Sequence, residues 1–259
     1  MNIKTDISTV SLTKCNSYEL NELRLEVDKL LEPFEGIRSF VSPGQKVLLK
    51  PNLLSAKSPE RAVTTHPHLI QVIAEKVIEA GGEPVIGDSP GGAIRGVKRV
   101  WDNTGIMEMA SAARLDLVNF ETSGIEEIIS GEYHFYISKA VLEADVIINL
   151  GKLKTHTLTL LTCGVKNIFG VIPGFRKSEL HKIFPKPGEF AAMLVELYKL
   201  ISPSLTIVDG ILAMEGNGPS SGKARKLGLL AEVDHREDAE RAVRRLRDLR
   251  ERVHDVGVL

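Results

Sequence analysis

Residues 144–156 have the sequence ADVIINLGKLKTH, in which an apolar run is followed by two lysines and a histidine spaced two residues apart. The apolar run predicts a buried β-strand. Because successive side chains of an extended chain point to opposite faces, Lys152, Lys154 and His156 would project from one face. We expect this face to be either a solvated edge or the floor of a site for a negatively charged molecule.

Strand and helix patterns alternate on both sides of this stretch. Strand patterns occur at residues 46–54, 83–92, 115–120 and 204–216, and helical patterns at residues 18–40, 67–82, 97–114 and 189–201. Such alternation is typical of a parallel sheet covered by helices. The predicted fold class is therefore α/β, with a mostly parallel or mixed sheet, an extra N-terminal helix and a C-terminal amphipathic helix.

Three segments are predicted along the chain. They are an N-terminal helical segment at 1–44, an α/β core domain at 45–230 and an atypical arginine-rich helical tail at 231–259. The tail contains no lysine and carries one narrow apolar seam, formed by Ala239, Ala242, Leu246, Leu249 and Val253. A helix docked on the body is the favoured interpretation because the seam is only about two heptads long. A homodimer joined through this seam is the alternative.

Composition excludes several classes of protein. The 259 residues are 43% hydrophobic with a formal net charge of -1, so no global charge favours nucleic acid or a membrane surface as a partner. The only cysteines, Cys15 and Cys163, cannot complete an iron–sulfur or four-cysteine zinc site, and His66 and His68 lack the spacing of a helical metal pair. No metal site is predicted, and the lack of a leader or membrane-span pattern predicts a cytoplasmic location.

Polar side chains cluster where the predicted strands end. Lys50 and Asn52 follow one strand, and the others are followed by Asp88 and Ser89, by the lysines and histidine of residues 152–156, and by Asp209. Ligands of open α/β sheets bind outside the carboxyl ends of the strands. A single charged residue there is commonly only the point where a strand reaches the surface, but four strand ends together favour a binding site.

A predicted helix start adds to this cluster. Thr65 and His66 precede Pro67, which is favoured at the first position of a helix, and either residue can cap the helix. The free N–H groups and the positive end of the helix dipole favour an anion. We therefore predict an anionic small molecule, a phosphate or carboxylate, as the ligand.

Lys152, Lys154, His156 and Asp88 are the predicted catalytic residues. Neighbouring lysines lower each other's pKa, so one of them could act as a base or Schiff-base nucleophile, although the cluster could equally be a passive anion cradle. His156 and Asp88 suit proton transfer, His156 because a histidine titrates near neutrality. A structural, hydrogen-bonded role for His156 is an equal alternative. The predicted ligand-binding residues are Lys50, Asn52, Thr65, His66, Ser89, Lys166, Asn167, Asp209 and Glu215.

Several motifs together resemble the family known as domain of unknown function 362. They include LLKPNLL, VIGDSPGG, INLGKLKTH, GVKNIFGVIPGFRK, HKIFP and IVDGILAMEGNGPSSGKARKLGLL, in order over roughly residues 45–230. The resemblance implies an α/β fold and a set of motif residues, which are Lys50, Asn52, Thr65, His66, Asp88, Lys152, Lys154, His156, Lys166, Asn167, Asp209 and Glu215. It implies no settled reaction or cofactor. The arginine-rich tail departs from the family's pattern and indicates a divergent or frame-changed end.

Two functions follow as hypotheses. The first is a cytoplasmic enzyme or cofactor-handling protein that binds an anionic small molecule over the strand ends. The second is a non-catalytic binding or electron-transfer accessory protein, since relatives in the resembling family often carry an iron–sulfur segment. A remoter similarity is to nickel-dependent lactate racemases, which use lysine and histidine around a tethered pyridinium cofactor.

Overall fold

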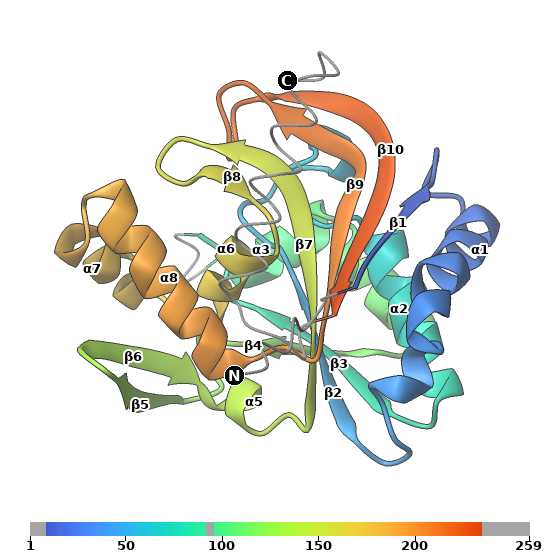
Figure 1. The fold of residues 1–259 in the computed structure, drawn as a ribbon, viewed down its shortest axis with the longest axis horizontal. Coiled ribbons are helices and arrows are strands. Elements are labelled where there is room, and N and C mark those ends of the chain that lie inside the picture. Colours follow the sequence, from blue (N-terminus) through green and yellow to red (C-terminus); the bar gives the residue numbers. More distant parts are fainter. Residues whose placement is uncertain (1–8, 92–95, 235–259) are drawn as a thin grey trace, which may run out of the picture.

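A mixed sheet of eight strands forms the centre of the molecule (Figure 1). The computed structural model describes residues 9–91 and 96–234. The strands of this sheet are β1 Val10–Lys14, β2 Lys46–Pro51, β3 Glu83–Asp88, β4 Asp116–Asn119, β7 Val146–His156, β8 Leu160–Thr162, β9 Leu205–Glu215 and β10 Lys223–Asp234. Their order is β1-β10-β9-β7-β2-β3-β4, with β8 paired to β7. A separate hairpin consists of β5 Ile125–Ser130 and β6 Tyr133–Ser138.

The central strands are parallel and the flanking strands are antiparallel. β2 pairs in parallel with β3 and β7, β3 with β4, and β7 with β9, whereas β10 pairs antiparallel with β9 and β1. The apolar runs of β2 and β7 are buried throughout, as expected for parallel strands covered on both faces. The carboxyl ends of β2, β3 and β7 consequently meet at one edge of the core.

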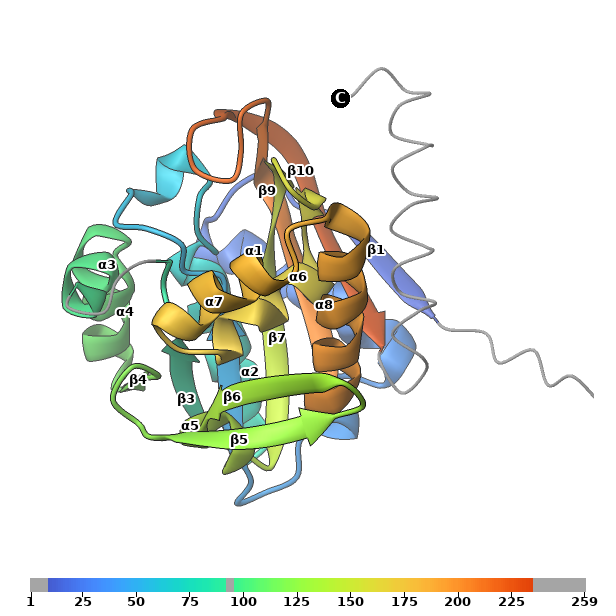
Figure 2. The same cartoon turned by 90° about the vertical axis from the view of Figure 1, so that its left-hand side faces the viewer.

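Helices cover both faces of the sheet, as the two views together show (Figures 1 and 2). One face packs against α1 Leu20–Leu31, α2 Pro67–Glu79 and α4 Ile106–Ala113, and the other against α6 Gly164–Asn167, α8 Pro187–Ile201 and the β5–β6 hairpin. The remaining helices are α3 Val97–Asn103, α5 Lys139–Leu142, α7 Phe175–Ile183 and the 3-10 turns η1 Glu32–Phe34, η2 Ile37–Ser39, η3 Pro59–Arg61 and η4 Ile168–Val171. Each face therefore has its own hydrophobic core, which we call the α2-side core and the α8-side core.

The predicted α/β class with a mixed, helix-covered sheet is confirmed. The predicted helix at 67–82 is α2, and its N-cap is His66, whose ring accepts a hydrogen bond from the backbone of His68. The helical pattern at 97–114 is two helices, α3 and α4, because Gly105 interrupts it with a φ of +75°. The predicted N-terminal helix is α1, and it is preceded by β1, which the sequence patterns did not indicate.

Strand pairing connects the three predicted segments. β10 begins within the predicted core domain and ends at Asp234, and β1 of the N-terminal segment pairs with it. The predicted helical tail lies otherwise outside the described residues. Among the described residues, no helix is both long and apolar enough to cross a membrane.

Candidate functional site

Lys50, at the end of β2, forms an ion pair with Asp88, at the end of β3. The distance from Nζ to Oδ1 is 2.8 Å, and both side chains are buried. Nζ also donates to the Pro51 carbonyl, while Asp88 Oδ2 accepts from the backbone N–H of Leu53. Burial lowers the pKa of Lys50 and the Asp88 carboxylate opposes this shift. Asp88 is thus fully engaged inside the protein rather than turned toward a ligand.

A second buried ion pair joins Lys152 of β7 to Asp209 of β9, with 2.8 Å between Nζ and Oδ2. The Tyr18 hydroxyl donates to Asp209 Oδ1 over 2.6 Å and accepts from Lys152 Nζ. The backbone N–H of His66, at the start of α2, donates to Asp209 Oδ2. The helix N-terminus predicted to attract an external anion therefore receives the carboxylate of Asp209.

The two ion pairs lie on opposite faces of the sheet. Lys50 follows Leu48 by two residues, and Leu48 belongs to the α8-side core, whereas Lys152 follows Leu150, which belongs to the α2-side core. Since side chains two apart share a face, the two ion pairs project into different cores. β7 and β9 also continue for several residues beyond Lys152 and Asp209, so neither residue stands at a strand end as predicted.

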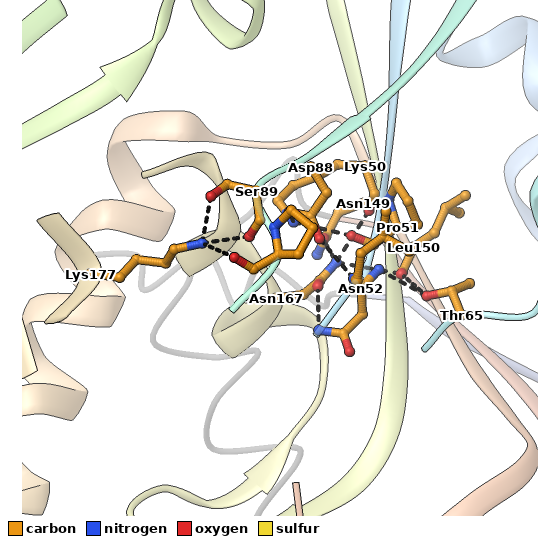
Figure 3. Close-up of polar contacts among 12 residues, drawn as sticks. Lys50, Pro51, Asn52, Thr65, Asp88, Ser89, Asn149, Leu150, Asn167 and Lys177 are labelled. Carbon is orange, nitrogen blue, oxygen red and sulfur yellow. Dashed lines mark hydrogen bonds and ion pairs between the residues drawn. The ribbon is translucent and has the colours of Figure 1, made fainter. Parts of the chain in front are cut away.

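Three asparagines connect β2, β7 and α6 at the sheet edge (Figure 3). The Asn167 amide nitrogen donates to Asn149 Oδ1 and to the Lys50 carbonyl, and its Oδ1 accepts from Asn52. Asn149 in turn donates to Thr206 Oγ1 and to the Gly164 carbonyl. This network fixes the Asn52 side chain, whose Oδ1 remains available to accept from a lysine.

Lys154 of β7 is that lysine. Its Nζ donates to Asn52 Oδ1 over 2.6 Å and to the Val63 carbonyl over 2.5 Å, and the side chain is only 2% exposed. Burial, with the charges of Lys152 and Lys166 adding to it, lowers the pKa of Lys154 to about 7. Its acceptors are neutral, so its charge is not matched by a carboxylate in contact.

Lys177 of α7 reaches the end of β3 from the α8 side (Figure 3). Its Nζ donates to Ser89 Oγ over 2.6 Å and to the carbonyls of Ser89 and Pro90. Burial lowers the pKa of Lys177 to about 8, although Asp88 and Glu121 act in the opposite direction. Glu121 also accepts a very short hydrogen bond from Ser89 Oγ and a longer one from the Gly174 backbone.

Lys166 of α6 interacts electrostatically with both of these lysines. Its Nζ is 4.4 Å from the ring centroid of Phe169 and 5.2 Å from that of Phe190. Burial lowers the pKa of Lys166 to about 7, and the charges of Lys177 and Lys50 add to this shift. Cation–π contacts of this kind contribute about 0.5–2 kcal/mol, which offsets only part of the desolvation.

His156 and His181 flank the same cations. Burial, with Lys166 adding to it, lowers the pKa of each histidine to about 4. The ring of His156 accepts at Nδ1 from the backbone N–H groups of Leu158 and Thr159, so its single proton at neutral pH lies on Nε2. The prediction that His156 titrates near neutrality therefore does not fit this environment, and its neutral ring is a hydrogen-bond donor.

Lys154, Lys166 and Lys177, which we call the lysine trio, form the candidate site. Among residues 9–91 and 96–234, none of the three has a carboxylate within ion-pair distance, in contrast to Lys50 and Lys152. They come from β7, α6 and α7. The charge of Lys166 lowers the pKa of Lys154, and the charge of Lys177 lowers the pKa of Lys166. Such a group of poorly matched cations can bind a phosphate or a carboxylate.

Residues 47–234 match the family model described as domain of unknown function 362. The chain belongs to this family. A thylakoid-associated protein of Synechocystis is 43% identical over 227 residues, which cover 87% of this chain and 70% of that protein.

The fold of this family member is also similar to that of the lactate racemase apoprotein from Thermoanaerobacterium thermosaccharolyticum. The TM-score is 0.52 with 16% sequence identity, over 89% of this chain and 55% of that structure. The chain thus spans about half the length of the solved structure. At this identity the similarity concerns the fold alone.

The remaining residues predicted from the family motifs have structural contacts. Thr65 Oγ1 donates to the Leu150 carbonyl and accepts from the Asn52 backbone, which ties the loop before α2 to β7. The His66 ring caps α2 and stacks on Tyr18 with 3.7 Å between centroids. Glu215 pairs with Arg225 at the end of β9. These contacts support the architecture around the lysine trio.

Sequence reasoning did not select Lys177, Glu121, His181 and Tyr18. Lys177 and His181 lie in the motifs GVKNIFGVIPGFRK and HKIFP, so the family motifs held the signal for both. Tyr18 and Glu121 lie outside every quoted motif, and only the folded chain brings them to Asp209 and Ser89.

Groups suited to metal or redox chemistry are sparse in the described part of this family member. Within residues 9–91 and 96–234, no three His, Cys, Asp or Glu side chains are grouped so that they could hold a metal ion. Cys15 and Cys163 are buried thiols whose pKa values are raised by desolvation to about 11. A high thiol pKa disfavours the reactive thiolate.

Proposed function

We propose that this protein binds an anionic small molecule through the lysine trio, as an enzyme or cofactor-handling protein. One observation supports the proposal above the others: the charges of the three lysines act on one another, and their contacts are neutral oxygens and aromatic rings. An anion bound there would supply the missing negative charge and would favour the protonated lysines. A phosphate or a carboxylate is the proposed ligand group.

The position of the site is consistent with the fold. Open α/β sheets bind ligands outside the carboxyl ends of their parallel strands. Lys154 contacts Asn52, which follows β2, and Lys177 contacts Ser89, which follows β3. The fold shared with a racemase apoprotein fits a small-molecule enzyme, but the residue roles proposed here come from this chain's own contacts.

The test is a thermal-shift screen with phosphorylated and carboxylated metabolites at pH 7, followed by calorimetric titration of the best anion. We expect at least one anion to raise Tm because a ligand that binds only the folded state stabilises it. Lys166→Gln and Lys177→Gln should each weaken binding by about 10- to 100-fold, as expected for a lost charge-assisted contact. The matched control is Lys182→Gln, an exposed lysine on the same helix as Lys177.

Absence of any stabilising anion, or equal affinity in the two trio variants and the wild type, would overturn the proposal. The predicted cytoplasmic location stays a proposal as well, and the relative's association with thylakoids makes a peripheral membrane location its alternative. Fractionation of cells that express the protein distinguishes the two.

A further inference from the structure

Lys166 differs from the other lysines near the strand ends in what its ammonium group contacts. Lys50 and Lys152 pair with carboxylates, and Lys154 and Lys177 donate hydrogen bonds to backbone and side-chain oxygens. Lys166 Nζ instead lies over two aromatic rings, and among the described residues it donates no hydrogen bond. Its ammonium group is therefore the one in this group that hydrogen bonds of the described residues stabilise least.

The surroundings of Lys166 favour a neutral amine. Burial and the charges of Lys177 and Lys50 disfavour the ammonium form, and the cation–π contacts with Phe169 and Phe190 offset only part of this effect. A pKa of about 7 leaves roughly half of the amine unprotonated at pH 7, compared with about one part in 2,500 for an ordinary lysine of pKa 10.4. Part of the residue remains exposed, in contrast to the buried Lys154.

We propose that Lys166 is a nucleophile that forms a Schiff base with the carbonyl carbon of an anionic aldehyde or 2-oxo acid. This inference rests on the proposed function, since the anionic group of the same molecule would be held by Lys154 and Lys177. It adds the substrate class: a small carbonyl compound that carries a carboxylate or phosphate. Desolvated lysines beside other cations are the usual nucleophiles for such substrates.

The step balances without a further reactant. The neutral amine of Lys166 attacks the carbonyl carbon, and one of its protons moves to the oxygen to give a carbinolamine. A protonated lysine of the trio then gives a proton to the hydroxyl group, which leaves as water, and the nitrogen keeps one hydrogen in a cationic iminium. His156, with its proton on Nε2, is a neighbouring donor for the carbonyl oxygen.

The experiment is reductive trapping of the full chain with glyoxylate and cyanoborohydride at pH 7, with the modified lysine mapped by peptide mass spectrometry. We expect Lys166 to be labelled at least about tenfold faster than exposed Lys182, because its neutral fraction is larger even after the lower nucleophilicity of a weaker base is allowed for. Lys166→Arg should abolish this fast labelling, whereas Lys182→Arg should leave it unchanged.

A second measurement separates this inference from the proposed function. Lys166→Arg keeps the positive charge, so the thermal shift given by the best anion of the screen should persist in this variant. Slow labelling at Lys166, or faster labelling at Lys154 or Lys177, with anion binding intact would overturn the Schiff-base assignment alone. Fast labelling at Lys166 in a protein that no anion stabilises would support the nucleophile and overturn the anion site.

Discussion

Lys152 and Asp209 form their ion pair on the face of the sheet opposite to the pair of Lys50 and Asp88, although the strands of the two lysines, β7 and β2, are paired neighbours. Each pair satisfies two charges inside one of the two cores. The four residues are therefore scaffold for the edge of the sheet, and the charge available to a ligand is left on the lysine trio.

Breaking the buried ion pair of Lys152 and Asp209 should strongly destabilise the fold. Lys152→Met or Asp209→Leu leaves an uncompensated buried charge, and each should lower the free energy of unfolding by about 3–5 kcal/mol. The double variant should be less destabilised than the sum of the two. Urea unfolding measures all three, and the exposed pair of Lys98 and Asp102 provides control variants with effects within about 1 kcal/mol. Additive losses would show that the two side chains do not act as a pair.

Tyr18→Phe tests the link between the N-terminal segment and this pair. The lost hydroxyl leaves Asp209, Lys152 and the Leu212 N–H each with one partner fewer, so we expect a loss of about 1–3 kcal/mol in urea unfolding. The stacking on His66 remains possible in the variant. Tyr136→Phe, on the β5–β6 hairpin, is the control and should change the stability by no more than about 0.5 kcal/mol. Equal effects of the two substitutions would contradict the role given to Tyr18.

Gly170→Ala should disturb the pair of Lys50 and Asp88 directly. A Cβ at this position would lie 2.6 Å from Lys50 Nζ and still nearer to Asp88 Oδ1, closer than real contacts allow. Because both side chains are buried, we expect a loss of about 1–3 kcal/mol from overpacking. Gly188→Ala is the matched control, since no atom lies within 4 Å of its added Cβ. A Gly170→Ala variant as stable as this control would show that the ion pair has room to move.

The ligand-free protein should become more stable as the pH rises from about 7 toward 10. Lys154 has a folded-state pKa of about 7 and an unfolded value near 10.5, so in this window the unfolded chain binds one more proton at this site than the folded chain. The free energy of unfolding then rises with pH, by at most about 1.4 kcal/mol per unit for this lysine. Below pH 7 Lys154 is protonated in both the folded and the unfolded chain, so the full cost of burying its charge remains.

Urea unfolding of wild type and Lys154→Met at pH 7 and pH 9 measures this contribution. From pH 7 to pH 9 the free energy of unfolding should rise less in the variant than in the wild type, by up to about 2–3 kcal/mol, because the variant has no titrating group at this position. Lys182→Met, an exposed control, should keep the wild-type pH dependence. An unchanged pH dependence in Lys154→Met would mean that Lys154 stays protonated in the fold.

Local sequence patterns predicted the parallel core well because each of its strands and helices is specified within one short segment of the chain. The apolar run of β7 and the His66 cap with Pro67 of α2 specify their own structures. The antiparallel addition of β1 to β10 depends on residues more than 200 positions apart, and no local pattern contains it. Glycine at 105 was visible in the sequence, but only its positive φ shows that it divides α3 from α4.

The candidate site was predicted in part for the same reason. Spacing alone placed Lys50, Asp88 and Lys154 near one sheet edge, but it could not show which lysines have carboxylate partners. Those partners lie 38 residues from Lys50 and 57 from Lys152 along the chain. The period-two argument for β7 could not assign Lys152 to the α2-side core, because a strand pattern does not say which helices cover each face.

Proton uptake on anion binding tests the central claim most directly. Calorimetric titration at pH 8.5 with the best anion of the thermal-shift screen, in buffers of different ionisation enthalpy, gives the number of protons bound. At this pH, lysines with pKa values of about 7 to 8 are largely neutral, and an anion in contact should raise these values, so we predict clear uptake. The variant with Lys166→Gln and Lys177→Gln should take up fewer protons. Tight binding with no proton uptake, or with the same uptake in this variant, would contradict a lysine-trio site.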